Sequence, residues 1–372
     1  MAEFPLAITL VCPGCGSRAS QDNFQPYACP LSHEVGPEHI LTRSIDVDVL
    51  REETDWKALF ESRDEDNPFI KYRRLFYAYR MARRKGVSDE AYVSLVRALD
   101  DAVAEVDGKG FRETPFFPSV ALGEALGFDP EYAPWIKNET INVSGSHKAR
   151  HLMGIMIWLK LFPEANPVSE SAPLAIASCG NAALGAAVVA KAGGMPLEVY
   201  VPPDANPKVL SMLSDLGARL SPCPREGDRA GDPCMHRFEE AVASGALPFT
   251  VQGPRNALCL EGGLTLGYEM AAELARTGTE LDALCIQVGG GALASSTVRG
   301  LMEARDLGVI QKVPRVYLVQ TESAYPLKRA YDRFVDRLLG EDTSEIGPDE
   351  SLKRAQGRAE AVSKLPREEL EA

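Results

Sequence analysis

Two different hydrophobic periods follow one another along the chain. Between residues 55 and 108, large apolar side chains recur at three- and four-residue spacings, which is typical of helices that bury one face. The two stripes are Tyr72, Phe76, Tyr79 and Met81, then Tyr92, Val96, Leu99 and Val103. From residue 134 onward, short apolar runs alternate with helical stretches. The predicted strands are Trp135–Lys137, Leu174–Ala177, Leu197–Val201, Leu284–Val288 and Arg315–Gln320.

Helical patterns fill the gaps between these strands. One runs from His151 to Phe162, one rich in alanine and glycine from Ala182 to Gly193, and one from Pro207 to Leu216. The last has proline in its first turn and Gly217 at its end, as helices favour. Repeated strand–helix–strand units predict an α/β fold with a mostly parallel sheet covered on both faces. In such folds, ligands bind beyond the carboxyl ends of the strands.

Composition and charge narrow the class of protein. The chain has 372 residues, 45% hydrophobic and 25% charged, which is enough for two domains with a large core. A net charge of −13 without a basic stripe argues against a nucleic-acid partner. No apolar run reaches membrane-spanning length, and the N-terminus lacks the features of a signal peptide. We therefore expect a cytoplasmic protein with no membrane or nucleic-acid partner.

The eight cysteines are too sparse for a disulfide framework, and only the first three form a group. Cys12 and Cys15 flank a Pro-Gly pair, and Cys29 is followed by His33. This spacing resembles a zinc ribbon, although its second half is Cys-x-x-x-His. Residues 1–40 are therefore predicted to form a zinc-ribbon-like segment, either loaded with zinc or metal-free.

Lys148 is the first candidate for chemistry. It follows the small-residue turn Ser144, Gly145 and Ser146 and precedes an almost wholly apolar run. Burial depresses the pKa of an ammonium group, and a neutral amine is the form that attacks an aldehyde. The alternative is an ordinary surface lysine at the start of a helix.

Two turns downstream lie where a strand ends and a helix begins. Val288–Leu293 reads Val-Gly-Gly-Gly-Ala-Leu, so backbone N–H groups and the helix dipole can bind one phosphate. It matches neither a nucleotide P-loop nor a dinucleotide fingerprint. Ser178–Asn181 could hold a carboxylate, and the amide of Asn181 can both donate and accept a hydrogen bond. Taken alone, each turn could equally be a structural turn that allows close packing and binds no ligand. Together with Lys148, they are what pyridoxal phosphate catalysis requires.

These motifs resemble the fold-type II pyridoxal-phosphate enzymes, and most closely the threonine synthases. The family pattern Lys-Asp-Glu-x-x-Asn-Pro-Thr-Gly-Ser-Phe-Lys-Asp-Arg reads here, over Lys137–Arg150, as Lys-Asn-Glu-Thr-Ile-Asn-Val-Ser-Gly-Ser-His-Lys-Ala-Arg. The resemblance covers residues 110 to 330. Further matching segments are Ser178–Ala182, Val201–Pro203, Pro207–Lys208, Leu216–Ala218, Glu261–Glu269, Val288–Leu293 and Gln320–Glu322.

The resemblance implies a role for each matched position. Lys148 would be the Schiff-base lysine and proton shuttle, and Asn181 would hydrogen-bond the ring hydroxyl of the cofactor. The phosphate would bind to Gly289, Gly290, Gly291, Ala292 and Leu293. The substrate carboxylate would bind to Ser178, Cys179, Gly180 and Asn181. Some threonine synthases also carry a cysteine-bearing N-terminus, and fold-type II enzymes are commonly homodimers.

Three positions depart from the family pattern. His147 replaces phenylalanine, and a stacking or structural role is favoured for it over acid–base work. Ala182 replaces the threonine or histidine that often follows the asparagine. The residue that contacts the pyridine nitrogen is not found, so we expect either that the C-terminal part of the larger domain is incomplete in this sequence or that it is unusual in this protein.

The fold expected from the resemblance is tryptophan synthase beta-like, with two parallel-sheet α/β domains. The larger, cofactor-binding domain would comprise residues 41–145 and 251–372, and the smaller one residues 146–250. The expected activity is elimination or replacement on a small amino-acid substrate, with threonine synthase-like conversion of O-phosphohomoserine as the first choice. Arg150, Lys208 and Ser146 are candidate contacts for the phosphate of that substrate. The alternatives are a serine/threonine ammonia-lyase and a non-catalytic protein that binds the cofactor or a metabolite.

Overall fold

The computed structural model describes residues 4–19, 26–31, 39–225, 227, 229–339, 347 and 353–359. The chain divides into two compact units, Met1–Leu284 with Gly290–Val316, and Cys285–Gly289 with Tyr317–Ala372. No described helix has the length and apolar character needed to span a membrane. The domain boundaries expected from the sequence stay a prediction.

The first half of the chain is mostly helical. Most of its α-helices begin at a side-chain cap: Ser88, for example, accepts a hydrogen bond from the N–H of Ala91 at the start of α6, and Gly108 ends that helix with a left-handed backbone. The elements are β1 (Ile8–Val11), β2 (Thr42–Ile45), α2 (Val47–Arg51), α3 (Trp56–Glu61), α4 (Pro68–Lys71), η1 (Arg73–Leu75), α5 (Tyr77–Arg84), α6 (Asp89–Asp107), β3 (Phe116–Pro118), α7 (Val120–Leu126), η2 (Pro130–Tyr132), β4 (Trp135–Lys137) and η3 (Val143–Gly145).

Strands and helices alternate in the second half, as the sequence predicts. The elements are α8 (Lys148–Leu161), β5 (Leu174–Ala177), α9 (Asn181–Ala192), β6 (Leu197–Val201), α10 (Pro207–Asp215), β7 (Arg219–Pro222), α11 (Pro233–Ala243), β8 (Leu247–Pro248), α12 (Cys259–Thr277), β9 (Ala283–Gln287), α13 (Ala292–Asp306), β10 (Arg315–Val319) and α14 (Pro326–Leu339).

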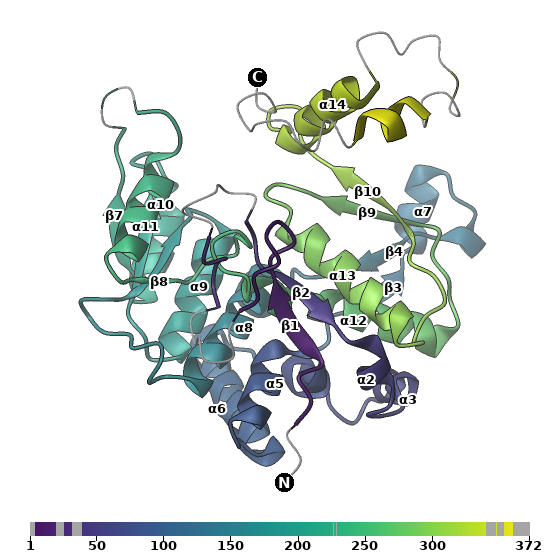
Figure 1. Ribbon diagram of the computed structural model, residues 1–372, viewed down its shortest axis with the longest axis horizontal. Helices are drawn as coiled ribbons and strands as arrows, with labels where there is room; N and C mark the ends of the chain where they lie inside the picture. The colour runs from purple at the N-terminus through teal and green to yellow at the C-terminus, as the bar shows by residue number, and fades with distance from the viewer. Residues whose placement is uncertain are drawn as a thin grey trace. The chain divides into compact units, whose positions relative to one another are not determined.

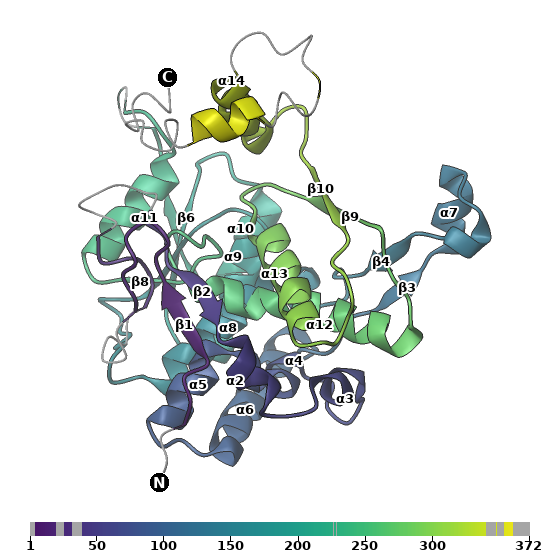
Figure 2. The ribbon, with the colours of Figure 1, turned by 45° about the vertical axis from the view of Figure 1, so that its right-hand side comes forward.

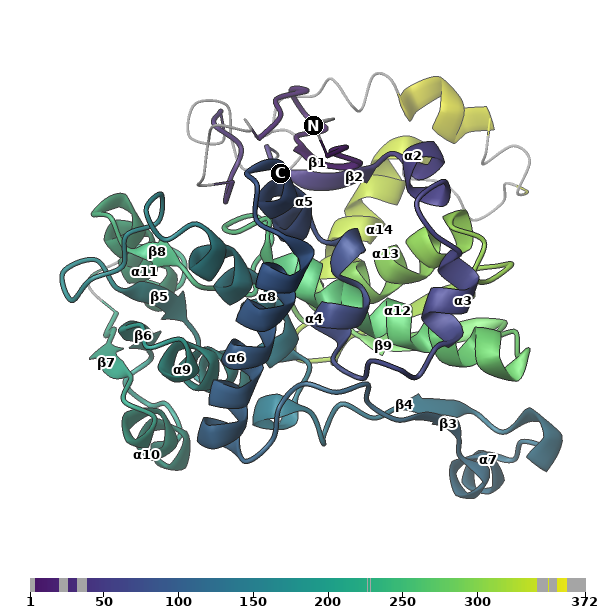
Figure 3. The same cartoon turned by 90° about the horizontal axis from the view of Figure 1, so that it is seen from below.

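A four-stranded parallel sheet carries the predicted α/β architecture. Its strand order is β7-β6-β5-β8, and Leu174 of β5 pairs with Leu197 of β6 and Leu247 of β8. Figure 3 shows α11 on one face of this sheet and α9 and α10 on the other. All four strands are parallel, so the loops after β5 and β7 leave the same edge of the sheet.

The predicted strand Trp135–Lys137 exists but does not join that sheet. It forms β4 and pairs antiparallel with β3, with Phe117 opposite Ile136. β9 and β10 form a separate two-stranded sheet. Trp135–Lys137 therefore departs from the mostly parallel arrangement that the sequence predicts, because the sequence pattern identifies a strand without identifying its neighbour.

The core of the first unit is a close packing of α8, α12 and α13 (Figure 1). Nearly every residue of α12 from Cys259 to Leu274 is buried. Gly262 allows the contact with α8, since a Cβ there would collide with the carbonyl oxygen of Arg150. Gly300 on α13 approaches α12 closely, because a Cβ there would lie 2.6 Å from Leu264 O. Figure 2 shows β1 and β2 beside these helices.

Candidate active site

A tight turn presents Lys148 at the first position of α8. Ser144 in this turn has φ 54°, the only positive value for a non-glycine residue in the described part of the chain. Such a backbone is strained for serine and persists where the surroundings hold it. The N–H of Lys148 donates to the buried Ser146 Oγ over 3.3 Å. The small-residue turn predicted around Lys148 is therefore real.

The side chain of Lys148 is half-buried, and burial lowers the pKa of its ammonium group. The nearby Cys259 thiol raises that pKa, but by less than burial lowers it. Among the described residues, no hydrogen bond or ion pair to Lys148 Nζ is found. A partly desolvated amine without a counter-ion is more easily deprotonated, as a nucleophilic lysine requires.

Two histidines lie directly beside this lysine. The rings of His147 and His151 are 5.6 Å apart in an edge-to-face arrangement. Burial lowers the pKa of His147 to about 2 and that of His151 to about 3, so both rings are neutral at physiological pH. His151 Nδ1 lies 2.7 Å from the carbonyl oxygen of Cys259 and therefore donates to it. This leaves His151 Nε2 as an acceptor, and the stacking or structural role favoured for His147 stays a prediction.

Packing brings the N-terminal ends of α9 and α13 to the same place. A Cβ at Gly185 of α9 would lie 3.1 Å from Ala149 N and 3.3 Å from Ser144 Oγ. A Cβ at Gly263 of α12 would collide with His151 and would lie 2.5 Å from Ser296 Oγ. Ser296 is one turn into α13, as His151 is in α8. The first turns of α8, α9 and α13 are thus linked through the contacts at Gly185 and Gly263.

The two predicted loops stand immediately before these helices. Ser178–Gly180 joins β5 to α9, and the N–H of Gly180 donates to Ser178 Oγ over 3.4 Å. Gly291 precedes α13 with φ 89°, which favours glycine. Gly290, Gly291, Ala292 and Leu293 belong to the same compact unit as Lys148. Gly289 belongs to the second unit, so its predicted phosphate contact stays a prediction.

Four buried polar atoms around Lys148 have no hydrogen-bond partner among the described residues. They are Ser144 Oγ, His147 Nε2, His151 Nε2 and Ser296 Oγ. Buried polar groups are almost always paired, by protein, water or ligand. This cluster sits on the two helix turns that flank Lys148 and Gly291. Its chemistry fits a polar cofactor bound at this position.

Arg150 does not act as proposed from the sequence. Its guanidinium is fully buried and binds Glu269 through Nη1 (2.5 Å) and Nη2 (3.0 Å), and Glu139 through Nε (2.9 Å) and Nη2 (3.0 Å). A further bond joins Arg150 to Thr265 Oγ1 at 2.9 Å. All its donor directions are used within the protein, so Arg150 is not available for a substrate phosphate. Lys208 is exposed on α10, and no described contact joins it to the Lys148 turn.

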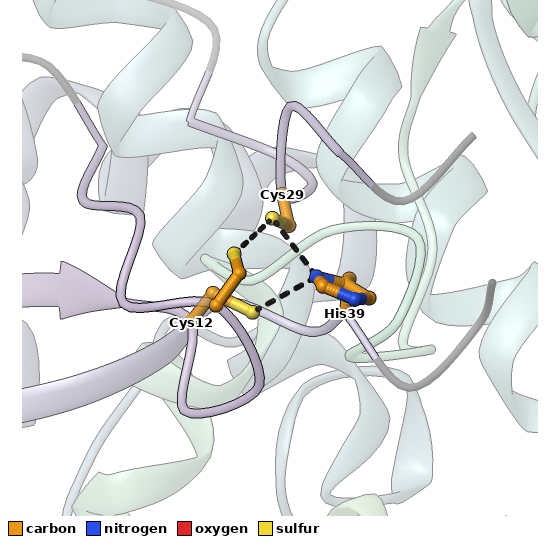
Figure 4. Close-up of side chains that lie close together, drawn as sticks. Cys12, Cys29 and His39 are labelled. Atoms are coloured by element: carbon orange, nitrogen blue, oxygen red, sulfur yellow. Dashed lines mark hydrogen bonds between the residues drawn. The ribbon is translucent and has the colours of Figure 1, made fainter. Parts of the chain in front are cut away.

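The N-terminal cysteines converge as predicted, with a different histidine. Cys12, Cys15, Cys29 and His39 each offer a ligand atom, and all four atoms lie within 4.8 Å of one another. Figure 4 shows Cys12 and Cys29 facing the same nitrogen of the His39 ring, with Nδ1 3.8 Å from Cys12 Sγ and 4.0 Å from Cys29 Sγ. Cys15 Sγ lies 3.6 Å from Cys29 Sγ. His33 lies outside the described residues.

Sequence reasoning missed His39, His151 and Ser296. His39 is ten residues from Cys29, beyond the short ligand spacing of a zinc ribbon, although its place just before a strand was a usable signal. His151 and Ser296 gain their position only from the contact of three helices at Gly263. No local motif marks such residues.

A family model described as pyridoxal-phosphate dependent enzyme matches residues 109–364. The chain is 27% identical over 207 residues to the serine dehydratase-like protein of Mus musculus, covering 55% of this chain and 57% of that protein. It is 24% identical over 240 residues to the threonine synthase of Methanosarcina acetivorans, covering 62% and 53%. The chain therefore spans about half the length of the curated relatives it matches.

Solved structures of similar fold include a pyridoxal 5'-phosphate-dependent aspartate racemase, with a TM-score of 0.48 and 19% identity over 67% of this chain and 68% of that chain. The structure of maize serine racemase gives a TM-score of 0.47 and 16% identity over 66% of this chain and 65% of that chain.

Replacing Lys148 should stabilise the cofactor-free protein at neutral pH. The pKa of Lys148 is lower in the folded protein than its ordinary value of 10.5, so the unfolded chain binds more protons and stability rises with pH up to that value. Below the folded pKa, burying the charged amine carries its full cost. We expect Lys148→Met to raise the melting temperature of the cofactor-free protein by a few degrees at pH 7, with the gain shrinking toward pH 10.5.

Melting curves of the two proteins across this pH range measure the effect. Lys57→Met is the matched control, because the Lys57 side chain is 61% exposed and should leave the melting temperature unchanged. A lower melting temperature for Lys148→Met at pH 7, or a difference that does not vary with pH, would contradict the burial of this amine.

Proposed function

This chain belongs to the family of pyridoxal-phosphate dependent enzymes, and we propose that it is a lyase that eliminates or replaces a group on an amino-acid substrate, with Lys148 as its catalytic residue. The observation that carries the proposal is the environment of Lys148. Its amine is half-buried without a partner among the described residues, at a point where three helix N-termini meet. Four unpaired buried polar atoms border the same place.

The described residues suggest how pyridoxal phosphate would be held. Lys148 Nζ would bond to the aldehyde carbon, and the backbone N–H groups of Gly290–Leu293 at the start of α13 would bind the phosphate. Asn181 would contact the ring hydroxyl, and Ser178–Asn181 the substrate carboxylate, as the family resemblance implies. When bound, the cofactor supplies an electron sink for negative charge that develops on the substrate.

The protein's own contribution is an amine whose ammonium form is disfavoured by burial. Burial disfavours the ammonium form of Lys148, so Nζ can take a proton from the substrate and return it at a later step. The rings of His147 and His151 stay neutral, and His151 offers Nε2 as a hydrogen-bond acceptor. Proton transfer is therefore assigned to Lys148 alone.

Threonine synthase-like chemistry on O-phosphohomoserine is our first choice of reaction. The register of the Lys137–Arg150 segment and the named threonine synthase relative support it. The second candidate is a serine/threonine ammonia-lyase, supported by the serine dehydratase-like relatives. The commitment of Arg150 to Glu139 and Glu269 removes one expected phosphate contact of a synthase. We also propose that the protein forms a homodimer. This part of the proposal rests only on the resemblance to fold-type II enzymes.

Pyridoxal phosphate should bind covalently to Lys148. Borohydride would reduce the bond, and peptide mass spectrometry would then find the added mass on the peptide that contains Lys148. Lys148→Ala should lower the labelled fraction at least tenfold, because no other amine occupies this site among the residues that the structure describes. Lys160→Ala, at the other end of α8, is the matched control and should be labelled like the wild type. Labelling of another lysine, or none in the wild type, would overturn the proposal.

Three substrates then separate the candidate activities on the loaded protein. Release of phosphate from O-phosphohomoserine together with threonine is the expected result. Formation of a keto acid and ammonia from serine or threonine, without that reaction, would replace the synthase by the ammonia-lyase. Turnover of none of the three by a fully labelled protein would favour the non-catalytic alternative.

We further propose a structural zinc ion at Cys12, Cys15, Cys29 and His39. Three sulfur ligands and one nitrogen ligand are a common set for structural zinc, and Zn–S bonds of ~2.3 Å in a tetrahedral site put ligand atoms ~3.8 Å apart. The separations of 3.6 Å, 3.8 Å and 4.0 Å in the described cluster suit this geometry. Cys12, Cys29 and His39 are buried, as a closed structural site requires.

Zinc analysis of the purified protein tests this assignment and the choice of histidine. We expect about one zinc per chain after dialysis, as one four-ligand site holds one ion. Cys15→Ser and His39→Ala should each lose most of it, whereas His33→Ala should retain it. Zinc retained by His39→Ala but lost by His33→Ala would assign the fourth ligand to His33 instead.

A further inference from the structure

The Cys/His cluster lies at one end of a strand pair. β1 ends at Val11, directly before Cys12, and β2 begins at Thr42, three residues after His39. Val11 pairs with Thr42 and Leu10 with Arg43. Among the described residues between the two strands, no helix or longer strand is present. The cluster therefore ties the segment between the two strands to the adjacent ends of β1 and β2.

Arg43 of β2 forms the first link from this segment to the helices of the site. Its guanidinium binds Glu303 of α13 through Nε (2.8 Å) and Nη2 (3.0 Å), and Glu261 of α12 through Nη1 (2.5 Å). The three side chains are 7%, 2% and 5% exposed, so the ion pairs are shielded from water. Removing one partner of a buried pair leaves an uncompensated charge. The position of Arg43 thus determines how α12 and α13 pack at this point.

Tyr27 forms a second, independent link. It stands two residues before Cys29, and its carbonyl oxygen accepts a hydrogen bond of 2.8 Å from the N–H of Ala257. Ala257 lies two residues before α12, whose first residue, Cys259, accepts the 2.7 Å hydrogen bond from His151. His151 lies one turn beyond Lys148. A short path of hydrogen bonds therefore joins the metal-binding loop to the turn that carries the catalytic lysine.

We propose that metal bound at Cys12, Cys15, Cys29 and His39 controls the affinity of the active site for pyridoxal phosphate, through Arg43 on one side and Tyr27 on the other. This inference rests on the proposed function, because its first test measures the binding of pyridoxal phosphate. Metal loss frees the ends of β1 and β2 and the loop that carries Tyr27. Arg43, the counter-ion that Glu261 and Glu303 share, is then no longer held in place, and α12 and α13 shift at the helix turns that hold the cofactor; Arg299 remains beside Glu303.

Cofactor affinity measured with and without metal tests the coupling. Pyridoxal phosphate is titrated into zinc-loaded full-length protein, into the same protein after chelator treatment, and after zinc is restored. We expect the dissociation constant to rise at least tenfold on chelation and to return with zinc. Equal affinity, within twofold, in the loaded and chelated states would overturn the proposal.

Two variants separate the link from the metal itself. Arg43→Met should keep its zinc, since Arg43 is not a ligand, yet bind the cofactor at least tenfold more weakly. Arg51→Met is the matched control: Arg51 also joins the N-terminal segment to α13, through the Asp306 carbonyl oxygen at 2.8 Å, but is exposed. It should bind within twofold of the wild type. Wild-type affinity in Arg43→Met would exclude Arg43 as the link.

Hydrogen exchange gives a readout that does not need the cofactor. Chelation should speed amide exchange in peptides covering residues 257–265 and 148–151, and should leave α10 (Pro207–Asp215) unchanged as the internal control. Unchanged exchange in both peptides would overturn the coupling even if Arg43→Met failed to fold. If chelation speeds exchange in these peptides but pyridoxal phosphate never labels Lys148, the link between the metal site and the helices stands and the proposed function is wrong.

Discussion

The buried contact between Arg150 and Glu269 is the interaction on which the candidate site depends. Both side chains are fully shielded, and the guanidinium also binds Glu139 and Thr265. Burial alone would raise the pKa of Glu269, but Arg150 and Lys137 reverse this and hold it below its usual value. The carboxylate therefore stays ionised, and its contribution to stability is lost only as pH falls through that lowered pKa. Breaking such a pair costs roughly 3–5 kcal/mol.

Two arginines bind α12 from different sides in the same way. Arg150 comes from the first turn of α8 and binds Glu269, whereas Arg43 comes from β2 and binds Glu261. Between these carboxylates, α12 presents Gly262, Gly263 and Gly267, which let the neighbouring helices approach without side chains in between. The ion pairs determine which face of α12 meets each neighbouring element. The glycines determine how closely the neighbouring helices approach α12. Lys148 and the start of α13 take their positions from this shared helix.

The sequence predicted the parts of the fold that depend on local pattern. Leu174–Ala177 and Leu197–Val201 were identified with correct ends, because short β-branched and apolar runs between turn residues are a local signal. Pairing is not local, so the antiparallel partner of Trp135–Lys137 was not foreseen. The same limit applied to Arg150: it stands beside the lysine motif, but its main partner Glu269 is 119 residues away. His39 was missed because the ligand spacing exceeds that of common zinc motifs.

The most direct test of the account is the labelling of Lys148 by pyridoxal phosphate and borohydride in Arg150→Met, with Arg276→Met as the matched control. Arg276 also binds a carboxylate of α12, Glu273, at 2.7 Å, but makes no described contact with α8. If the Arg150–Glu269 contact positions the first turn of α8, Arg150→Met should stay folded by circular dichroism and lose at least nine-tenths of the label, while the control keeps it. Full labelling of Lys148 in Arg150→Met, with wild-type cofactor affinity, would contradict that claim.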